Sequence, residues 1–171
     1  SFGGSGAFAS GEGIAVDSVG NVFLSGEYGA ANLTAPPLTV LGNQDVFAIK
    51  LDADGATVWA KGFGGNQPTT TFSRGIRVDG AGNAYVGGFF YLGNLIAPSM
   101  LKMGDWDAFA LRLDVAGNVI WTKHIGGSGS RTVANAIGVG NPGNVYLGGY
   151  FSSGNLTSPP LNRIGDTDAF V

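Results

Sequence analysis

Carboxylates in turns are the first residues of this sequence that could do chemistry, because carboxylate oxygens bind metal ions. Asp52-Ala53-Asp54-Gly55 resembles the start of a calcium loop, with two carboxylates at alternate positions. Calcium takes six or more oxygen ligands, and an EF-hand loop supplies further carboxylates and a distal Glu. The related segment Asp114-Val115-Ala116-Gly117 keeps only one of the two carboxylates. The pattern therefore favours a turn over a metal site.

A catalytic centre would need a base or a nucleophile with partners. His124 is the single histidine, and the sequence predicts a solvent-facing or loosely packed side chain there. Ser128-Gly129-Ser130 is a glycine-serine loop without the nucleophile elbow of hydrolases. An enzyme with a metal in a central channel would have to draw its ligands from Asp17 and Asp79. We therefore predict no catalytic residue, no bound metal and no cofactor.

An aromatic residue in a polar loop is the best candidate for ligand binding. Trp106 follows Asp105 in the loop Gly104-Asp105-Trp106-Asp107, where it could stack on a sugar or anchor a protein partner. With Tyr91 nearby, Trp106 and Asp105 form our candidate ligand-binding site. The alternative is that Trp106 covers apolar surface at the edge of a sheet. The aromatic run Phe89 to Tyr91 is expected to pack between sheets.

Two asparagines match the acceptor pattern for N-glycosylation. Asn32-Leu33-Thr34 and Asn155-Leu156-Thr157 fit it, whereas the related Asn94-Leu95-Ile96 does not. Asn32 and Asn155 are thus candidate glycan sites in a secretory setting, and inherited turn residues in a bacterial one. A recurring aspartate, present as Asp45, Asp107 and Asp168, is expected to bond to backbone groups rather than to do chemistry.

The elements that position these residues are set by an internal repeat. Phe2-Gly3-Gly4, Phe63-Gly64-Gly65 and Ile125-Gly126-Gly127 recur about every 61 or 62 residues, and other landmarks keep the same order. The units span approximately residues 1–61, 62–123 and 124–171, the last being incomplete. Each unit contains four strand signals, exemplified by GIAVD, NVFLSGEY, DVFAIKLD and TVWAKGFG. No segment has an apolar period long enough for a helix.

The sequence also predicts the connections between strands. The recurrent Asp-x-x-Gly predicts a type I turn closed by a glycine in the left-handed region. Gly140-Asn141-Pro142-Gly143 departs from this pattern, so we expect a different turn there. The long connection from Tyr28 to Asp45 is expected to fold over the outside of the unit or to line one face. The first strand of each unit is short and carries few charges, so it should lie innermost.

Four antiparallel strands per repeat predict an all-β fold made of β-propeller blades. A stacked solenoid or a pair of β-sandwiches is the alternative. Glycines such as Gly87, Gly88, Gly148 and Gly149 would allow close packing near the axis. Propellers close with about four to eight blades, so three blades, one of them incomplete, do not make a ring. We expect further blades of the same polypeptide, or other copies of the chain, to complete the array.

Composition limits the classes of partner. Hydrophobic residues make up 44% and charged residues 12% of the 171 residues, which is typical of a folded domain. The net charge of −3 gives no basic surface for nucleic acid, and no apolar run reaches the length of a membrane helix. There is no cysteine, so disulfides and thiolate metal sites are excluded.

The repeated phrases resemble a known bacterial family. GIAVDSVGNVFLSGEY, then DAFALRLDVAGNVIW, then a closing KGFGG or KHIGG, are similar to the β-propeller repeat called SBBP. The resemblance covers essentially the whole chain. It implies a propeller of the kind found in secreted or cell-surface proteins, with no catalytic residue to carry over. We therefore predict a non-enzymatic extracellular or cell-surface scaffold that assembles through repeat contacts, with a carbohydrate-binding or protein-binding propeller as the alternative.

Overall fold

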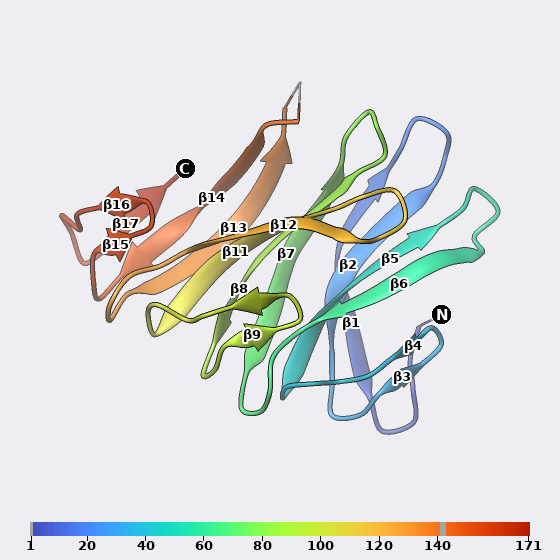
Figure 1. Cartoon of the computed structure of the whole chain (residues 1–171), viewed down its shortest axis with the longest axis horizontal. Helices are drawn as coiled ribbons and strands as arrows, with labels where there is room; N and C mark the ends of the chain where they lie inside the picture. Colours follow the sequence, from blue (N-terminus) through green and yellow to red (C-terminus); the bar gives the residue numbers. More distant parts are fainter. Residues whose placement is uncertain (1, 141–142) are drawn as a thin grey trace.

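The regular secondary structure of the described residues consists of strands. The computed structural model describes residues 2–140 and 143–171, and this part of the chain contains no helix. Its strands form one large mixed sheet and three small two-stranded sheets (Figure 1). The predicted all-β fold is confirmed.

The large sheet is divided into three units that follow the sequence repeat. Within each unit every strand pairs with the next in an antiparallel ladder. A single parallel bridge joins one unit to the next, Gln44 to Thr70 and then Trp106 to Arg131. Unit 1 contains β1 (Phe8–Val16), β2 (Val22–Gly29), β5 (Gln44–Leu51) and β6 (Thr57–Phe63). Unit 2 contains β7 (Thr70–Val78), β8 (Ala84–Tyr91), β11 (Trp106–Leu113) and β12 (Val119–Ile125), and unit 3 contains β13 (Arg131–Val139), β14 (Val145–Ser152) and β17 (Thr167–Phe170).

The first strand of each unit is longer than the sequence predicts. β1, β7 and β13 each have nine residues, whereas the predicted strand began only at Gly13 or its equivalent. The additional residues continue the ladder on the other side of a β-bulge between Gly11 and Gly13. Glycine and serine have little intrinsic preference for strands, so pairing with the neighbouring strand is what extends β1.

The predicted Asp-x-x-Gly turns are present. Asp17, Asp52, Asp79 and Asp114 each accept backbone N–H groups from their own turn. The fourth-position glycines are left-handed, with φ of 88°, 85°, 81° and 80° at Gly20, Gly55, Gly82 and Gly117. The different turn expected at Gly140 to Gly143 includes residues 141–142, which lie outside the described residues.

Two arrangements were expected for the long connection in each unit. In the structure, the connection lines one face of its sheet. It contains a hairpin that the sequence did not predict. In unit 1, Leu33 and Leu38 of this hairpin are buried in a cluster with Tyr28 and Phe47. The three hairpins are β3 (Leu33–Thr34) with β4 (Pro37–Leu38), β9 (Leu95–Ile96) with β10 (Ser99–Met100), and β15 (Leu156–Thr157) with β16 (Pro160–Leu161).

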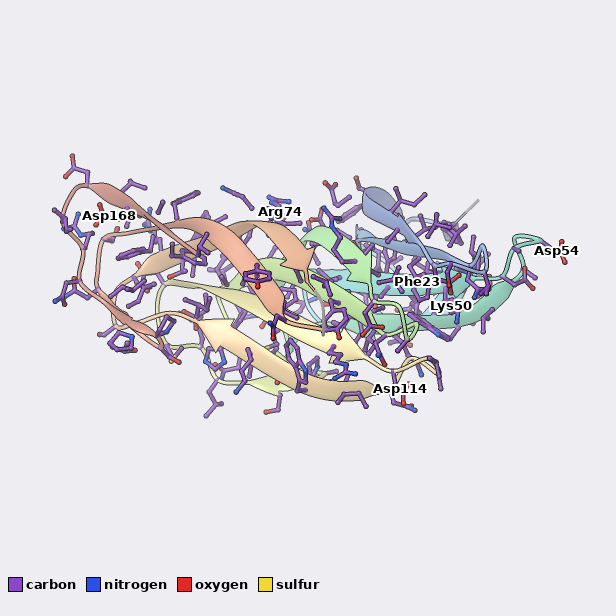
Figure 2. The ribbon with its side chains drawn as sticks, turned by 90° about the horizontal axis from the view of Figure 1, so that it is seen from above. Phe23, Lys50, Asp54, Arg74, Asp114 and Asp168 are labelled. Atoms are coloured by element: carbon purple, nitrogen blue, oxygen red, sulfur yellow. The ribbon has the colours of Figure 1, made fainter. Side chains whose placement is uncertain are left out.

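The units pack face to face. Phe23 and Trp59 of unit 1 share a buried cluster with Ile76 and Leu111 of unit 2, and unit 2 packs on unit 3 in the same manner. The first strands lie side by side, β7 between β1 and β13. Phe23, Lys50 and Asp54 of unit 1 lie toward one end of this array and Asp168 of unit 3 lies at the other (Figure 2). Over the described residues the array stays open, with β1 and β17 as its outermost strands.

Of the four glycines that were expected to allow close packing, Gly87 does so between units, whereas a Cβ added to Gly88 or Gly149 would meet a carbonyl of its own unit and one added to Gly148 would meet nothing closer than 3.7 Å. A Cβ added to Gly13 would lie 2.8 Å from the Cα of Gly75, where β1 meets β7. A Cβ added to Gly87 would lie 2.9 Å from the Leu147 side chain, between units 2 and 3. Side chains at these positions would push neighbouring units apart.

Candidate functional site

The three predicted ligand-binding residues line one surface depression. Tyr91, Asp105 and Trp106 surround a cavity of about 320 Å³ together with three residues that the sequence did not single out, Leu92, Lys102 and Arg131. Unit 1 has Gly29 and Gln44 at the positions that Tyr91 and Trp106 occupy in unit 2, so it lacks both aromatic rings. This departure from the repeat was the signal available in the sequence.

Strand register brings these residues together. Trp106 and Tyr91 are cross-strand partners on β11 and β8. The parallel bridge between units then places Arg131 of β13 beside Trp106. The backbone N–H groups of Asp105 and Trp106 donate to the carbonyl of Ser130, at 2.7 and 3.2 Å, and so fix the loop against unit 3.

Aromatic rings form a parallel stack across the sheet at this depression. The ring of Trp106 lies 5.0 Å from that of Tyr91 and 5.5 Å from that of Phe89, with interplanar angles of 20° and 6°. Phe72 of β7 continues the stack at 4.7 Å from Phe89. The faces of these rings are therefore in contact with one another, and the stack forms a packed layer on β7, β8 and β11.

A cation also lies near the ring of Trp106. The Arg131 guanidinium lies 6.0 Å from the Trp106 ring and 3.8 Å from the carboxylate of Asp105. A sugar stacks on the face of an aromatic ring, so the Arg131 side chain would have to move before a sugar could bind Trp106 in that way. This geometry favours the packing role that the sequence analysis kept as the alternative for Trp106.

The predicted aromatic cluster Phe89 to Tyr91 is divided between two faces. Successive side chains on a strand point to opposite sides of the sheet. Phe89 and Tyr91 join the stack with Trp106, whereas Phe90 lies 6.4 Å from Phe109 in the cluster shared with unit 1. Phe90 therefore packs between units as expected, whereas Phe89 and Tyr91 stack on Trp106 within unit 2.

A buried charged group lies between units 1 and 2 and was missed by the sequence analysis. The buried Glu27 carboxylate of β2 accepts the Ser73 N–H at 3.0 Å and lies 3.6 Å from the Arg74 guanidinium of β7. Burial, and then the nearby Glu12, raise the pKa of Glu27 to about 7, although Arg74 acts in the opposite direction. The signal in the sequence was a Glu where units 2 and 3 have aromatic residues.

The recurring aspartates have the structural role that was expected. Asp107 is buried and its carboxylate accepts the N–H groups of Met103 and Gly104 at 2.5 and 2.9 Å. Asp45 and Asp168 make the equivalent bonds in their own units. Each carboxylate therefore holds the loop that enters the third strand of its unit.

The carboxylates considered as metal ligands are bonded within their turns. Asp17 accepts the side-chain and backbone N–H groups of Asn21 at 2.7 and 2.9 Å, and Asp79 is bonded in the same way by Asn83. Among residues 2–140 and 143–171, no group of three or more His, Cys, Asp or Glu residues is placed to hold a metal ion.

His124 was expected to be solvent-facing or loosely packed. It is half-buried on β12, and its Nε2 is buried without a hydrogen-bond partner among the described residues. Its equivalent in unit 1 is Gly62, where an added Cβ would collide with the hydroxyl of Tyr28. Unit 2 has Phe90 in place of Tyr28, and the absence of that hydroxyl leaves room for a larger residue.

The candidate glycosylation residues share a role with Asn94, their equivalent in unit 2, which lacks the acceptor pattern. The side-chain oxygens of Asn32, Asn94 and Asn155 each accept a backbone N–H at 2.8 Å, from Val40, Lys102 and Arg163 respectively. All three asparagines are exposed. The common bond explains why asparagine recurs there without reference to glycans.

The two end faces of the array expose residues that are buried between units. Ile14 of unit 1 is 64% exposed, whereas its equivalents Ile76 and Ile137 are 0% and 3% exposed. Tyr146 of unit 3 is 54% exposed, whereas its equivalents Phe23 and Tyr85 are 0% and 1% exposed. We call the surface around Ile14 and Val16 the first face, and the surface around Tyr146 the last face.

Comparison with known proteins does not identify a family for the chain. No family model matches the chain, and no curated protein matches it. The described residues also contain no helix that could span a membrane.

Proposed function

We propose that the chain is a non-enzymatic scaffold built of β-propeller-type blades, which assembles by packing its end faces against further units of the same repeat. The resemblance to the SBBP repeat supports the same proposal and adds an extracellular or cell-surface location. The four-stranded antiparallel units, packed face to face with their first strands side by side, are the arrangement that propeller blades require.

The end faces carry the proposal. In each interior contact, the second-strand aromatic of one unit and the first-strand Ile of the next are both buried: Phe23 with Ile76, then Tyr85 with Ile137. The exposed Tyr146 and Ile14 are the two halves of one more such contact. Burying an apolar side chain of this size contributes about 1.5–3 kcal/mol, so both faces gain by meeting another unit.

The test is the assembly state of the chain as a function of concentration, measured by analytical ultracentrifugation. Ile14→Asp should weaken self-association because it places a charge in the contact. Val19→Asp, at an exposed turn position of the same unit, is the matched control and should leave association unchanged. A chain that stays monomeric at all concentrations, or that associates equally well with Ile14→Asp, would contradict the proposal.

A second candidate function is carbohydrate binding at the depression around Trp106. It is supported by the meeting of Tyr91, Asp105 and Trp106 in one depression, where unit 1 has Gly29 and Gln44 in place of the two aromatic residues. Binding on a glycan array should be lost in Trp106→Ala and strengthened in Arg131→Ala, which uncovers the ring. An array that stays silent for the chain and for Arg131→Ala counts against this function.

A further inference from the structure

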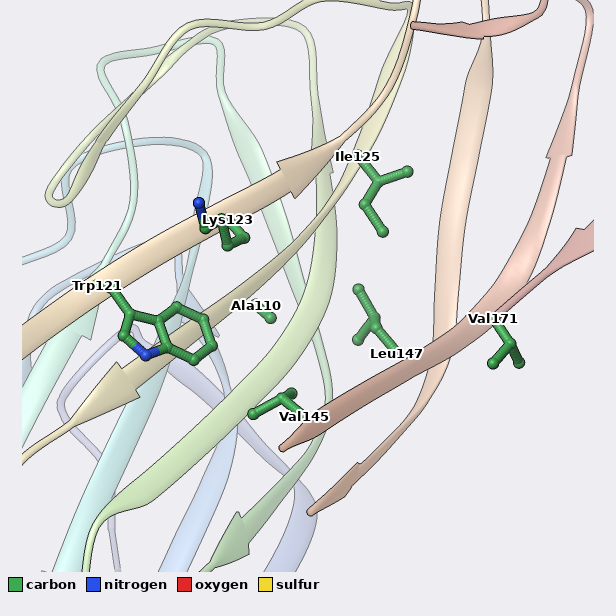
Figure 3. Close-up of a pocket in the computed structure, with 7 residues that line it drawn as sticks. All are labelled: Ala110, Trp121, Lys123, Ile125, Val145, Leu147 and Val171. Atoms are coloured by element: carbon green, nitrogen blue, oxygen red, sulfur yellow. The ribbon is translucent and has the colours of Figure 1, made fainter. Parts of the chain in front are cut away.

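The cavities between neighbouring units differ in polarity. Between units 2 and 3 there is an open slot, lined mainly by apolar side chains such as Trp121 of β12 and Leu147 of β14 (Figure 3). Between units 1 and 2 there is a cavity of about 260 Å³ whose lining includes a carboxylate and an ammonium group, those of Asp17 and Lys50. The second cavity therefore has the groups that could bind a polar ligand.

Turns of both units form this polar cavity. The β1–β2 turn lines it from unit 1, and Gly80 to Gly82 of the β7–β8 turn line it from unit 2. Lys50, near the end of β5, also lines it. The cavity thus lies at the opposite end of β8 from Tyr91, and it is separate from the depression around Trp106.

The ammonium group of Lys50 has hydrogen-bonding capacity that the protein leaves unused. Lys50 is only 9% exposed, and its Nζ lies 5.2 Å from the centre of the Phe23 ring, beside it in Figure 2. An ammonium group carries three N–H donors. Over the described part of the chain, Lys50 Nζ makes neither a hydrogen bond nor an ion pair. A ligand in the cavity can therefore accept from it.

The carboxylate of Asp17 differs from its equivalent in unit 2 by one hydrogen bond. Oδ2 of Asp79 accepts the side-chain N–H of the turn asparagine and the hydroxyl of Tyr85, both at 2.8 Å. Oδ2 of Asp17 accepts the turn asparagine at 2.7 Å and no hydroxyl, because Phe23 occupies the position of Tyr85. A carboxylate oxygen can accept two hydrogen bonds, so Asp17 has one position to offer a ligand hydroxyl.

The charges of the two groups select a neutral ligand. Asp17 and Lys50 line the same cavity without forming an ion pair. A free anion would be repelled by Asp17, and a free cation by Lys50. A hydroxyl group both donates and accepts. It can donate to Asp17 as the Tyr85 hydroxyl does to Asp79, and it can accept from Lys50.

We propose that this cavity binds a neutral, hydroxyl-rich compound of the size of one sugar ring, through Asp17 and Lys50. Sites for drug-sized ligands have volumes of about 300–1,000 Å³, so a cavity of about 260 Å³ takes a smaller molecule. Val19 and Val115 are exposed apolar residues in the same lining, and they offer a surface to the C–H groups of a ring. The site goes beyond the proposed function, because it lies between two units of one chain and needs no assembly.

The test is a titration of the chain with glucose, galactose and mannose, followed by two-dimensional proton–nitrogen NMR. At least one sugar should bind saturably and shift the backbone amide signals of the β1–β2 turn and of Gly80 to Gly82. Sodium phosphate and sodium acetate, titrated in the same way, should leave these signals in place. Saturable binding of the anions alone, or of none of these compounds, would overturn the inference.

Phe23→Tyr is the sharpest variant, because the added hydroxyl should bond to Asp17 as Tyr85 bonds to Asp79. The variant should fold, since Tyr85 is buried at the equivalent position of unit 2. It fills the acceptor position that the ligand needs, so sugar binding should weaken about tenfold or more. Equal binding by Phe23→Tyr and by the unchanged chain would mean that Asp17 is not part of a site.

The Lys50 variants test the donor. Lys50→Met removes the ammonium group and should also weaken sugar binding about tenfold or more. Lys50→Arg copies Arg112, the equivalent residue of unit 2, and should retain binding because it keeps N–H donors. Undiminished binding by Lys50→Met would contradict the proposal. Trp106→Ala should leave this binding unchanged, which separates the cavity from the second candidate function.

A free sugar and the terminal residue of a glycan offer the same chemistry. Binding on a glycan array that is lost in Lys50→Met and kept in Trp106→Ala would identify a glycan end as the source. Binding of a free monosaccharide with a silent array would identify a free sugar. Either result supports the cavity, whether or not the chain associates through its end faces.

Discussion

The indole nitrogen of Trp59 donates a hydrogen bond of 3.1 Å to the backbone carbonyl of Val115, 56 residues later in the chain. Trp59 lies on the outer strand β6 of unit 1, and Val115 lies in the turn after β11 of unit 2. The bond therefore joins two units at the side away from the first strands. It adds a directional contact to the apolar cluster that contains Trp59, and so helps to fix the rotation of one unit on the next.

Trp59→Phe should lower the free energy of unfolding by about 2 kcal/mol, because it removes this bond and part of a buried ring. Trp121→Phe is the matched change, since Trp121 is equivalent in unit 2 but only half-buried, beside the open slot. It should cost about half as much or less. Urea denaturation of both variants measures the difference, and equal losses would mean that the bond to Val115 contributes nothing.

Asp107→Ala should destabilise the chain by about 2–4 kcal/mol, because two N–H groups, of Met103 and Gly104, lose their acceptor in a mostly buried place. Asp168 makes equivalent bonds to Ile164 and Gly165, but it is only half-buried on β17 and both of its partners are exposed. Asp168→Ala should therefore cost about 1 kcal/mol or less, since water can replace the carboxylate. Thermal or urea unfolding of the pair checks this, and a larger effect at Asp168 would contradict it.

Gly64→Ala tests the contact between the recurring aspartate and the next unit. An added Cβ at Gly64 would collide with the carboxylate of Asp45, whereas at the equivalent Gly3 it would meet nothing within 4 Å. Gly64→Ala should thus cost about 1–3 kcal/mol, and Gly3→Ala should be nearly neutral. If the Gly64→Ala chain unfolds at the same urea concentration as the unchanged chain, the close approach of Asp45 to Gly64 is not a constraint in solution.

The repeat and its turns were predictable because their signals are local. Asp17 and Gly20 define a turn through bonds within four residues, and the alternation in DVFAIKLD defines a strand with one face toward each neighbour. The first half of β1 was not predictable, since its glycine and serine become a strand only through pairing with β2. Strand length there depends on the partner, which a local pattern does not contain.

The candidate site also contains residues that the sequence predicts and residues that it does not. Tyr91 and Trp106 could be associated from the sequence because each is an aromatic departure from the repeat near the same loop. Arg131 could not, because it reaches Trp106 through a bridge between two units. Glu27 and Arg74 are likewise 47 residues apart and meet only when unit 2 packs on unit 1. Contacts between units are therefore the part of this molecule that sequence patterns leave out.

Stability should depend on pH through Glu27. Its pKa in the folded chain is raised to about 7 from an ordinary 4.5, mainly by burial and secondarily by Glu12. A carboxyl whose pKa is raised on folding binds its proton more tightly in the folded state, so it favours folding when protonated. This contribution is fully present below about pH 4.5 and is lost as the pH rises through about 7.

The free energy of unfolding should therefore fall by about 1–2 kcal/mol between about pH 4.5 and 7.5, less than the full shift implies because solvent that reaches the Glu27–Arg74 pair stabilises the ionised carboxylate. Hydrogen bonds from Asn118 lower the pKa of Asp114, so that group loses its contribution only at more acidic pH, outside this window. Glu27→Gln removes the titrating group but keeps an acceptor for the Ser73 N–H. Urea unfolding of both chains across this pH range should show a steeper slope in the unchanged chain than in Glu27→Gln, where burial still raises the pKa of Asp45 and leaves a smaller slope. An equal slope in the two chains would assign the pH dependence to another group.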